Sequence, residues 1–78
     1  MSNIASGRQI RAARILAGLT QAELANAAGY HTRAVRYWES KEDGLPTCVP
    51  ETLDRVEHAL LENGVVVFTS PTPGARVA

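Results

Sequence analysis

The stretch that decides the fold is residues 19–39, which read LTQAELANAAGYHTRAVRYWE. Thr20 and Glu23 form a Thr-x-x-Glu capping box, a pattern that starts a helix because each side chain satisfies a free main-chain N–H of the other residue. Gly29 follows a run of alanines and supplies a tight turn, since glycine adopts positive φ without strain. The stretch therefore predicts two short helices joined at this glycine.

The second of these helices has two different faces. Val35 and Trp38 recur at helical spacing and predict its buried side. Arg33 and Arg36 are three residues apart and would repel each other weakly on an isolated helix. Their placement on one exposed face is easier to understand if an anion binds there. This layout is typical of a helix-turn-helix, in which the first helix braces the second against DNA. The outward side chains are Thr32, Arg33, Arg36 and Tyr37.

Helices are also expected on both sides of the central pair. Ser6 is a suitable N-cap for a helix from Gly7 or Arg8 to about Ala17, and residues 1–6 are expected to be a flexible tail. Pro50 opens a helix that runs to about Glu62, because proline at the first helical position loses no hydrogen bond. The domain thus spans residues 7–62, with a long polar loop at residues 41–49.

The remaining residues, 63–78, contain the β-branched and aromatic run Val65–Thr69, which predicts a strand, and a shorter strand is possible at Ala75–Ala78. A lone strand or hairpin is marginally stable in water and leaves an open edge. Two arrangements would give the strand Val65–Thr69 a pairing partner or a surface to pack on. The favoured one is a homodimer in which Val65–Thr69 pairs with its copy, so that this segment is the dimerisation element. The alternative is a hairpin folded back on helices one and four of its own chain.

Charge is distributed unevenly along this 78-residue chain, although its formal net charge is zero. Residues 8–41 carry six basic and two acidic side chains, whereas residues 42–78 carry two basic and six acidic ones. Attraction to phosphates depends on the local patch within about one Debye length, so a neutral total is compatible with a nucleic-acid partner.

The motifs Leu19-Thr20-Gln21-x-Glu23-Leu24-Ala25 and Gly29, Val35 and Glu39 resemble the phage-repressor-type helix-turn-helix, also called the xenobiotic response element family. The likeness covers about residues 7–61, and the tail is similar to that of a subgroup of very short bacterial regulators. It implies a mainly α, four- to five-helix lambda-repressor-like domain with a C-terminal β-strand or hairpin.

The resemblance also implies roles for individual residues. Gln21 matches a phosphate-contacting glutamine, and Arg14 and Glu39 match a pair that commonly forms a salt bridge. Thr32, Arg33 and Arg36 match positions that reach the major groove. This chain departs from the family pattern at His31, Tyr37 and Trp38, and its loop after the third helix is longer than is typical.

The arginines of the third helix could read bases or hold phosphates. An arginine can donate two hydrogen bonds to a guanine, which discriminates bases, whereas a phosphate contact adds affinity alone. Base contact is the favoured role for Arg33, whereas base contact and phosphate contact both remain open for Arg36. Lys41 is a reasonable phosphate contact. Tyr30 and Tyr37 are as suited to phosphate contact or rim packing as to base reading, and Arg8 and Arg11 are expected to be solvated.

Catalysis and metal binding find little support in the sequence. His31 and His58 have no carboxylate cluster at ligand spacing, and Cys48 is the only cysteine. We therefore expect no enzyme activity, no cofactor and no metal site. No apolar run approaches the ~18 residues needed to cross a membrane, and the N-terminus lacks a signal-peptide core, so a cytoplasmic protein is expected.

Three functions remain open at this point. The leading one is a sequence-specific transcriptional regulator, a dimeric repressor that reads a palindromic site in double-stranded DNA with helix 31–39. The second is the antitoxin of a toxin–antitoxin pair, with a toxin as protein partner. The third is an adaptor that keeps the fold without binding DNA. Only a DNA binder should lose affinity for DNA as salt rises.

Overall fold

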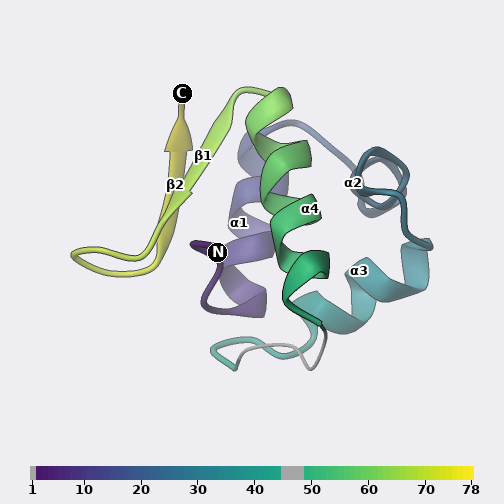
Figure 1. The fold of residues 1–78 in the computed structure, drawn as a ribbon, viewed down its shortest axis with the longest axis horizontal. Coiled ribbons are helices and arrows are strands. Elements are labelled where there is room, and N and C mark those ends of the chain that lie inside the picture. Colours follow the sequence, from purple (N-terminus) through teal and green to yellow (C-terminus); the bar gives the residue numbers. More distant parts are fainter. Residues whose placement is uncertain (1, 45–48) are drawn as a thin grey trace.

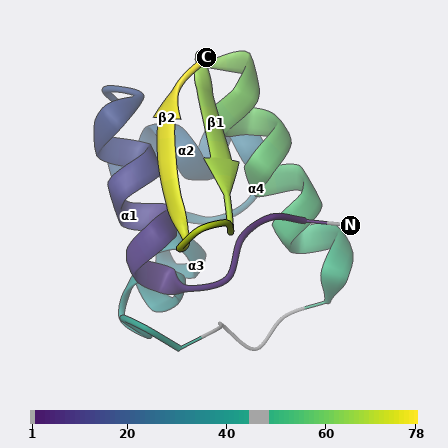
Figure 2. The same cartoon turned by 90° about the vertical axis from the view of Figure 1, so that its left-hand side faces the viewer.

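A computed structural model describes residues 2–44 and 49–78. The described part contains α1 (Gly7–Leu16), α2 (Gln21–Ala28), α3 (Thr32–Glu39), α4 (Pro50–Glu62), β1 (Val65–Phe68) and β2 (Gly74–Val77). The two strands cover one side of α1 and α4, and α2 and α3 lie on the other side (Figures 1 and 2). The predicted fold class, mainly helical with a C-terminal hairpin, is confirmed.

Local sequence explains where the first helices begin and where α2 ends. The Ser6 hydroxyl accepts the main-chain N–H of Gln9, and Thr20 and Glu23 form both hydrogen bonds of the capping box. Gly29 ends α2 with φ at +84°, the left-handed conformation that favours glycine. His31 occupies the N-cap of α3 without a side-chain hydrogen bond. Packing, more than capping, must therefore stabilise α3.

The core lies where the four helices and the hairpin meet. Its largest fully buried side chains are aliphatic, and burial of each contributes roughly 1.5–3 kcal/mol. Trp38 of α3 is also buried. Ile15 and Leu16 at the end of α1 are 62% and 45% exposed, outside this core. The fully buried set is Ile10, Leu24, Leu60, Val35, Val56, Val65 and Val67.

The C-terminal strands pair with each other as an antiparallel hairpin, with Val65 opposite Val77 and Phe68 opposite Gly74. Pairing within the chain, the second of the two arrangements considered, is what the structure contains. The first arrangement needs correcting in one respect, because Val65–Thr69 does not depend on a second copy for a pairing partner. Both Val65 and Val67 are packed into the core of their own chain.

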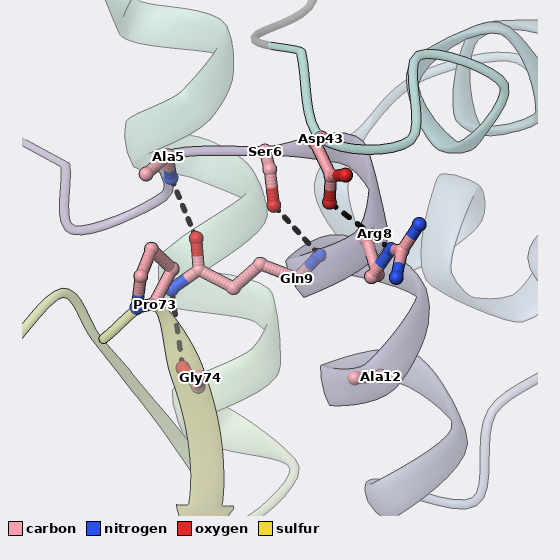
Figure 3. Close-up of a pocket in the computed structure, with 8 residues that line it drawn as sticks. All are labelled: Ala5, Ser6, Arg8, Gln9, Ala12, Asp43, Pro73 and Gly74. Carbon is pink, nitrogen blue, oxygen red and sulfur yellow. Dashed lines mark hydrogen bonds and ion pairs between the residues drawn. The ribbon is translucent and has the colours of Figure 1, made fainter.

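Gln9 ties the beginning of the chain to its end. Its side-chain amide donates to the carbonyl oxygens of Asn3, Phe68 and Gly74 at 3.0, 2.8 and 3.1 Å, and its Oε1 accepts the N–H of Ala5. Figure 3 shows this side chain reaching from α1 towards the hairpin. Ile4 is buried in the core. Residues 2–6 therefore make more contacts than a free tail would. Cys48 lies outside the described residues.

Candidate nucleic-acid interface

The position of α3 is set by a close approach of two helix ends. The beginning of α1 at Gly7 meets the end of α3, and a Cβ at Gly7 would lie far inside contact distance of the carbonyl oxygen of Trp38. The residues after α3 complete the junction, because the carbonyls of Glu42 and Gly44 accept the N–H groups of Arg8 and Gly7 at 2.7 and 3.1 Å. Only glycine fits here.

Glu39, the last residue of α3, is bound by both neighbouring helices. Its carboxylate accepts hydrogen bonds from Arg14 Nε at 2.7 Å and Nη2 at 3.2 Å, and from Gln21 Nε2 at 3.2 Å. The side chains of Glu39 and Arg14 are 3% and 15% exposed. The Arg14–Glu39 salt bridge implied by the resemblance is thus present, and it connects α1, α2 and α3 at one point.

Arg8 and Arg11, expected to be solvated, are 60% and 40% exposed in their side chains, and both also form ion pairs. Arg11 Nη2 donates to the Glu42 carboxylate at 2.8 Å and to the main-chain oxygen of Glu39 at 2.9 Å. Arg8 Nε lies 3.2 Å from Asp43 Oδ1. In the sequence these acids belong to the acidic part, residues 42–78, and the arginines to the basic part, residues 8–41. The turn after α3 brings the acids back to the arginines. All three arginines of α1 therefore have acidic partners.

Arg33 and Arg36 have the opposite surroundings. Both are exposed on the outer face of α3, and neither forms an ion pair or hydrogen bond with any residue that the structure describes. Positions three apart on a helix are neighbours, so the two guanidinium groups share one face. Unpaired arginines so placed can donate two hydrogen bonds in parallel to a phosphate or a guanine edge.

The other predicted contacts surround this pair. Thr32 is half-buried at the first turn of α3, and Tyr37 is 42% exposed. The Lys41 ammonium lies 4.6 Å from the centre of the Tyr37 ring, so a cation–π contact fixes its place just beyond the helix. Gln21 is half-buried, and its amide already donates to Glu39. Any DNA contact by Gln21 must use its remaining polar positions.

Tyr30 belongs to the interior side of the motif. Its hydroxyl donates to Thr52 Oγ1 at 3.1 Å, and its ring packs edge-on against Trp38 with centroids 5.4 Å apart. Of the roles considered for Tyr30, rim packing is the one that the structure supports.

Sequence reasoning missed Arg11 as a residue that positions α3. A signal was present, because Arg11 precedes Arg14 by three residues and hence lies one turn away on the same side of α1. The acidic pair Glu42–Asp43 was assigned to an acidic half of the chain. The turn that returns it to α1 could not be deduced from charge counts alone.

Other kinds of site are not apparent in the described part of the chain. Among these residues there is no group of three or more histidine, cysteine, aspartate or glutamate side chains that could hold a metal ion. Similarly, none of the helices within residues 2–44 and 49–78 has the length and apolar character needed to span a membrane.

The sequence profile of the helix-turn-helix family matches residues 10–47, which include α2, α3 and most of α1. No curated protein matches the chain significantly. The fold and this match are consistent with a phage-repressor-like helix-turn-helix domain of the Cro/C1 type over the matched residues. Proteins with this domain bind DNA and regulate transcription, and they are generally not enzymes.

Proposed function

We propose that this protein is a sequence-specific transcriptional repressor that binds a palindromic operator as a homodimer, with α3 in the major groove. The observation that carries the proposal is the pair Arg33 and Arg36, exposed and unpaired with any described residue while the arginines of α1 are all paired. Exposed cations without acidic partners are free to replace the counterions of DNA phosphates.

The support for each contact differs. Arg33 and Arg36 supply base or phosphate contacts, with Thr32 and Tyr37 beside them on α3, and Lys41 supplies a phosphate contact beyond its end. Gln21 supplies a phosphate contact from the start of α2, where free main-chain N–H groups and the helix dipole also favour an anion. In this proposal the protein acts in the cytoplasm, where its operator lies.

The homodimer follows from the palindrome in this proposal. Two recognition helices related by a two-fold axis read two half-sites about one helical turn apart on the same face of the duplex. The C-terminal segment, residues 63–78, supplies the contact between the two copies.

The decisive experiment is in vitro selection of DNA from a random pool, followed by sequencing and by gel shifts of the selected site across salt concentrations. A palindromic consensus and an affinity that falls linearly on a log–log plot with salt are expected. Selection of no motif would reject sequence-specific binding. Affinity that is absent at low salt would reject DNA binding altogether and favour the adaptor function.

A further inference from the structure

A surface pocket lies where three distant parts of the chain meet: the start of α1, the turn after α3 and the start of β2 (Figure 3). Its volume is about 360 Å³, near the lower end of the range found for small-molecule sites. None of the described residues proposed to contact DNA is among those that line it. The DNA-binding proposal therefore leaves this pocket without a function.

The side chain of Gln9 forms a fixed wall of the pocket. Gln9 is 3% exposed, and its amide nitrogen donates to the carbonyl oxygens of Phe68 and Gly74 at 2.8 and 3.1 Å. Its Oε1 accepts the N–H of Ala5, and Figure 3 shows the carboxamide held between Ala5 and Gly74. These hydrogen bonds keep the wall in one conformation. A preformed wall lowers the entropic cost of binding a ligand.

A buried hydroxyl group lies beside this wall. Ser6 is 8% exposed, and its Oγ accepts the main-chain N–H of Gln9 at 3.1 Å. Among the residues that the structure describes, none accepts a hydrogen bond from the Ser6 hydroxyl. A buried O–H gains free energy when it finds an acceptor, so Ser6 favours a ligand oxygen in the pocket.

The exposed rim of the pocket carries one charge of each sign. Arg8 Nε lies 3.2 Å from Asp43 Oδ1, and the two side chains are 60% and 83% exposed. A guanidinium has five N–H donors and a carboxylate can accept several hydrogen bonds, so both groups can bind further partners. Glu42 lies 3.7 Å from Arg8 Nη2 and is paired with Arg11 at 2.8 Å. The rim is therefore close to neutral.

The rest of the lining is apolar and consists of the methyl groups of Ala5 and Ala12 and the ring of Pro73. A ligand that matches the whole pocket has a compact apolar body and one edge with both an acceptor and a donor, because Arg8 can only donate and Asp43 only accept. An anion would have to displace Asp43 from Arg8, and a cation would have to displace Arg8 from Asp43. Both replacements leave a charge of the protein without its partner.

We infer that this pocket binds a small neutral molecule with a carboxamide-type edge on a compact apolar body. The carbonyl oxygen of the ligand accepts from the Arg8 guanidinium, its N–H donates to the Asp43 carboxylate, and its body lies against Ala12 and Pro73. Such a ligand contacts α1 and the turn after α3 together. The inference goes beyond the proposed function and does not depend on DNA binding.

The test is titration of the ¹⁵N-labelled full chain with three ring compounds of matched size, followed by NMR. Benzamide offers a donor and an acceptor, benzoate only acceptors and benzamidinium only donors. Benzamide should shift the amide signals of residues 5–12, 43 and 74, with a dissociation constant at least about threefold below those of the other two. Shifts confined to other residues, no saturable shifts, or equal or tighter binding of a charged compound would overturn the inference.

Three variants locate the site. Arg8→Ala removes the donor, and Ala12→Leu fills the pocket from an exposed position on α1. Each should raise the dissociation constant of benzamide about threefold or more and leave the circular dichroism spectrum unchanged. Arg55→Ala is the matched control, because Arg55 is 54% exposed, paired with Glu51 on α4 and not part of the lining.

The control variant should bind benzamide as the wild type does. A dissociation constant that stays unchanged in Arg8→Ala or in Ala12→Leu, or one that rises equally in Arg55→Ala, would overturn the inference. Gel shifts without benzamide test DNA recognition separately, so the failure of one proposal is distinguishable from the failure of the other.

Discussion

Arginines on α1 and arginines on α3 belong to the same small domain and have opposite surroundings. Those on α1 face acids at the end of α3 and in the turn after it, whereas Arg33 and Arg36 face solvent. The difference teaches that charge along the chain is a poor guide to the DNA-binding face. Of the six basic residues between positions 8 and 41, the three on α1 pair with acids at the end of α3 or in the turn after it, and the other three form no ion pair with a described residue.

We call the arginines of α1 the inner arginines and those of α3 the outer arginines. The largest effect on stability should come from breaking the contacts that the inner arginines make with Glu39. Glu39→Gln leaves Arg14 largely buried without its counter-charge, and we expect the free energy of unfolding to fall by about 3–5 kcal/mol in urea denaturation. Glu42→Gln is the matched control, because Glu42 is 53% exposed and its ion pairs should contribute only about 0–1 kcal/mol. Similar losses for both variants would contradict the importance assigned to Glu39.

The junction between α1 and α3 can be forced apart without changing any charge. In Gly7→Ala, the added methyl group collides with the carbonyl of Trp38, and we expect a loss of about 1–3 kcal/mol in the free energy of unfolding. DNA affinity should fall as well, since α3 must shift relative to α2. A variant as stable as the wild type would show that the two helix ends can separate without cost.

The outer arginines should affect DNA binding and leave stability unchanged. Replacing Arg33 with Ala should cost about 1–3 kcal/mol against the selected operator and relax the preference at one base pair, if it reads a guanine. Arg33→Lys is the informative companion, because lysine keeps the charge and loses the two-pronged geometry. A uniform loss over all sequences, rescued by lysine, would make Arg33 a phosphate contact.

The smallest effect is expected at Arg8, whose side chain is 60% exposed and paired with Asp43. Arg8→Ala should change the free energy of unfolding by less than about 1 kcal/mol and leave the salt dependence of DNA binding as it is. Arg36→Ala provides the contrast, since loss of a phosphate contact lowers the slope by about 0.9. If Arg8→Ala lowered the slope equally, the division between inner and outer arginines would be wrong.

Much of the fold was predictable because local sequence patterns determine where its helices begin and end. The Ser6 and Thr20 caps, the turn at Gly29 and the proline that opens α4 each act within a few residues of the chain, and the structure has all of them. The Arg14–Glu39 pair came from the family resemblance alone. Capping and turn patterns predict structure only within the few residues that form them.

Contacts between distant segments were not predictable in the same way. The ion pairs of Arg8 and Arg11 depend on how the chain turns after Ser40, and no spacing rule specifies that turn. The choice between a hairpin and a strand exchanged between copies depended on whether α1 and α4 offer a surface for Val65 and Val67. That surface exists only once the helices have packed.

The hydrogen bonds of Gln9 have a consequence for the order in which the protein opens. They join residues 59 and 65 positions apart in the sequence, so each of them closes a long loop of the chain. The N–H of Ala5 is held by the same side chain. The hydrogen-exchange rate of the Ala5 N–H should therefore report detachment of the hairpin, which lies almost seventy residues away in the sequence. The two ends of the chain should exchange as one cooperative unit.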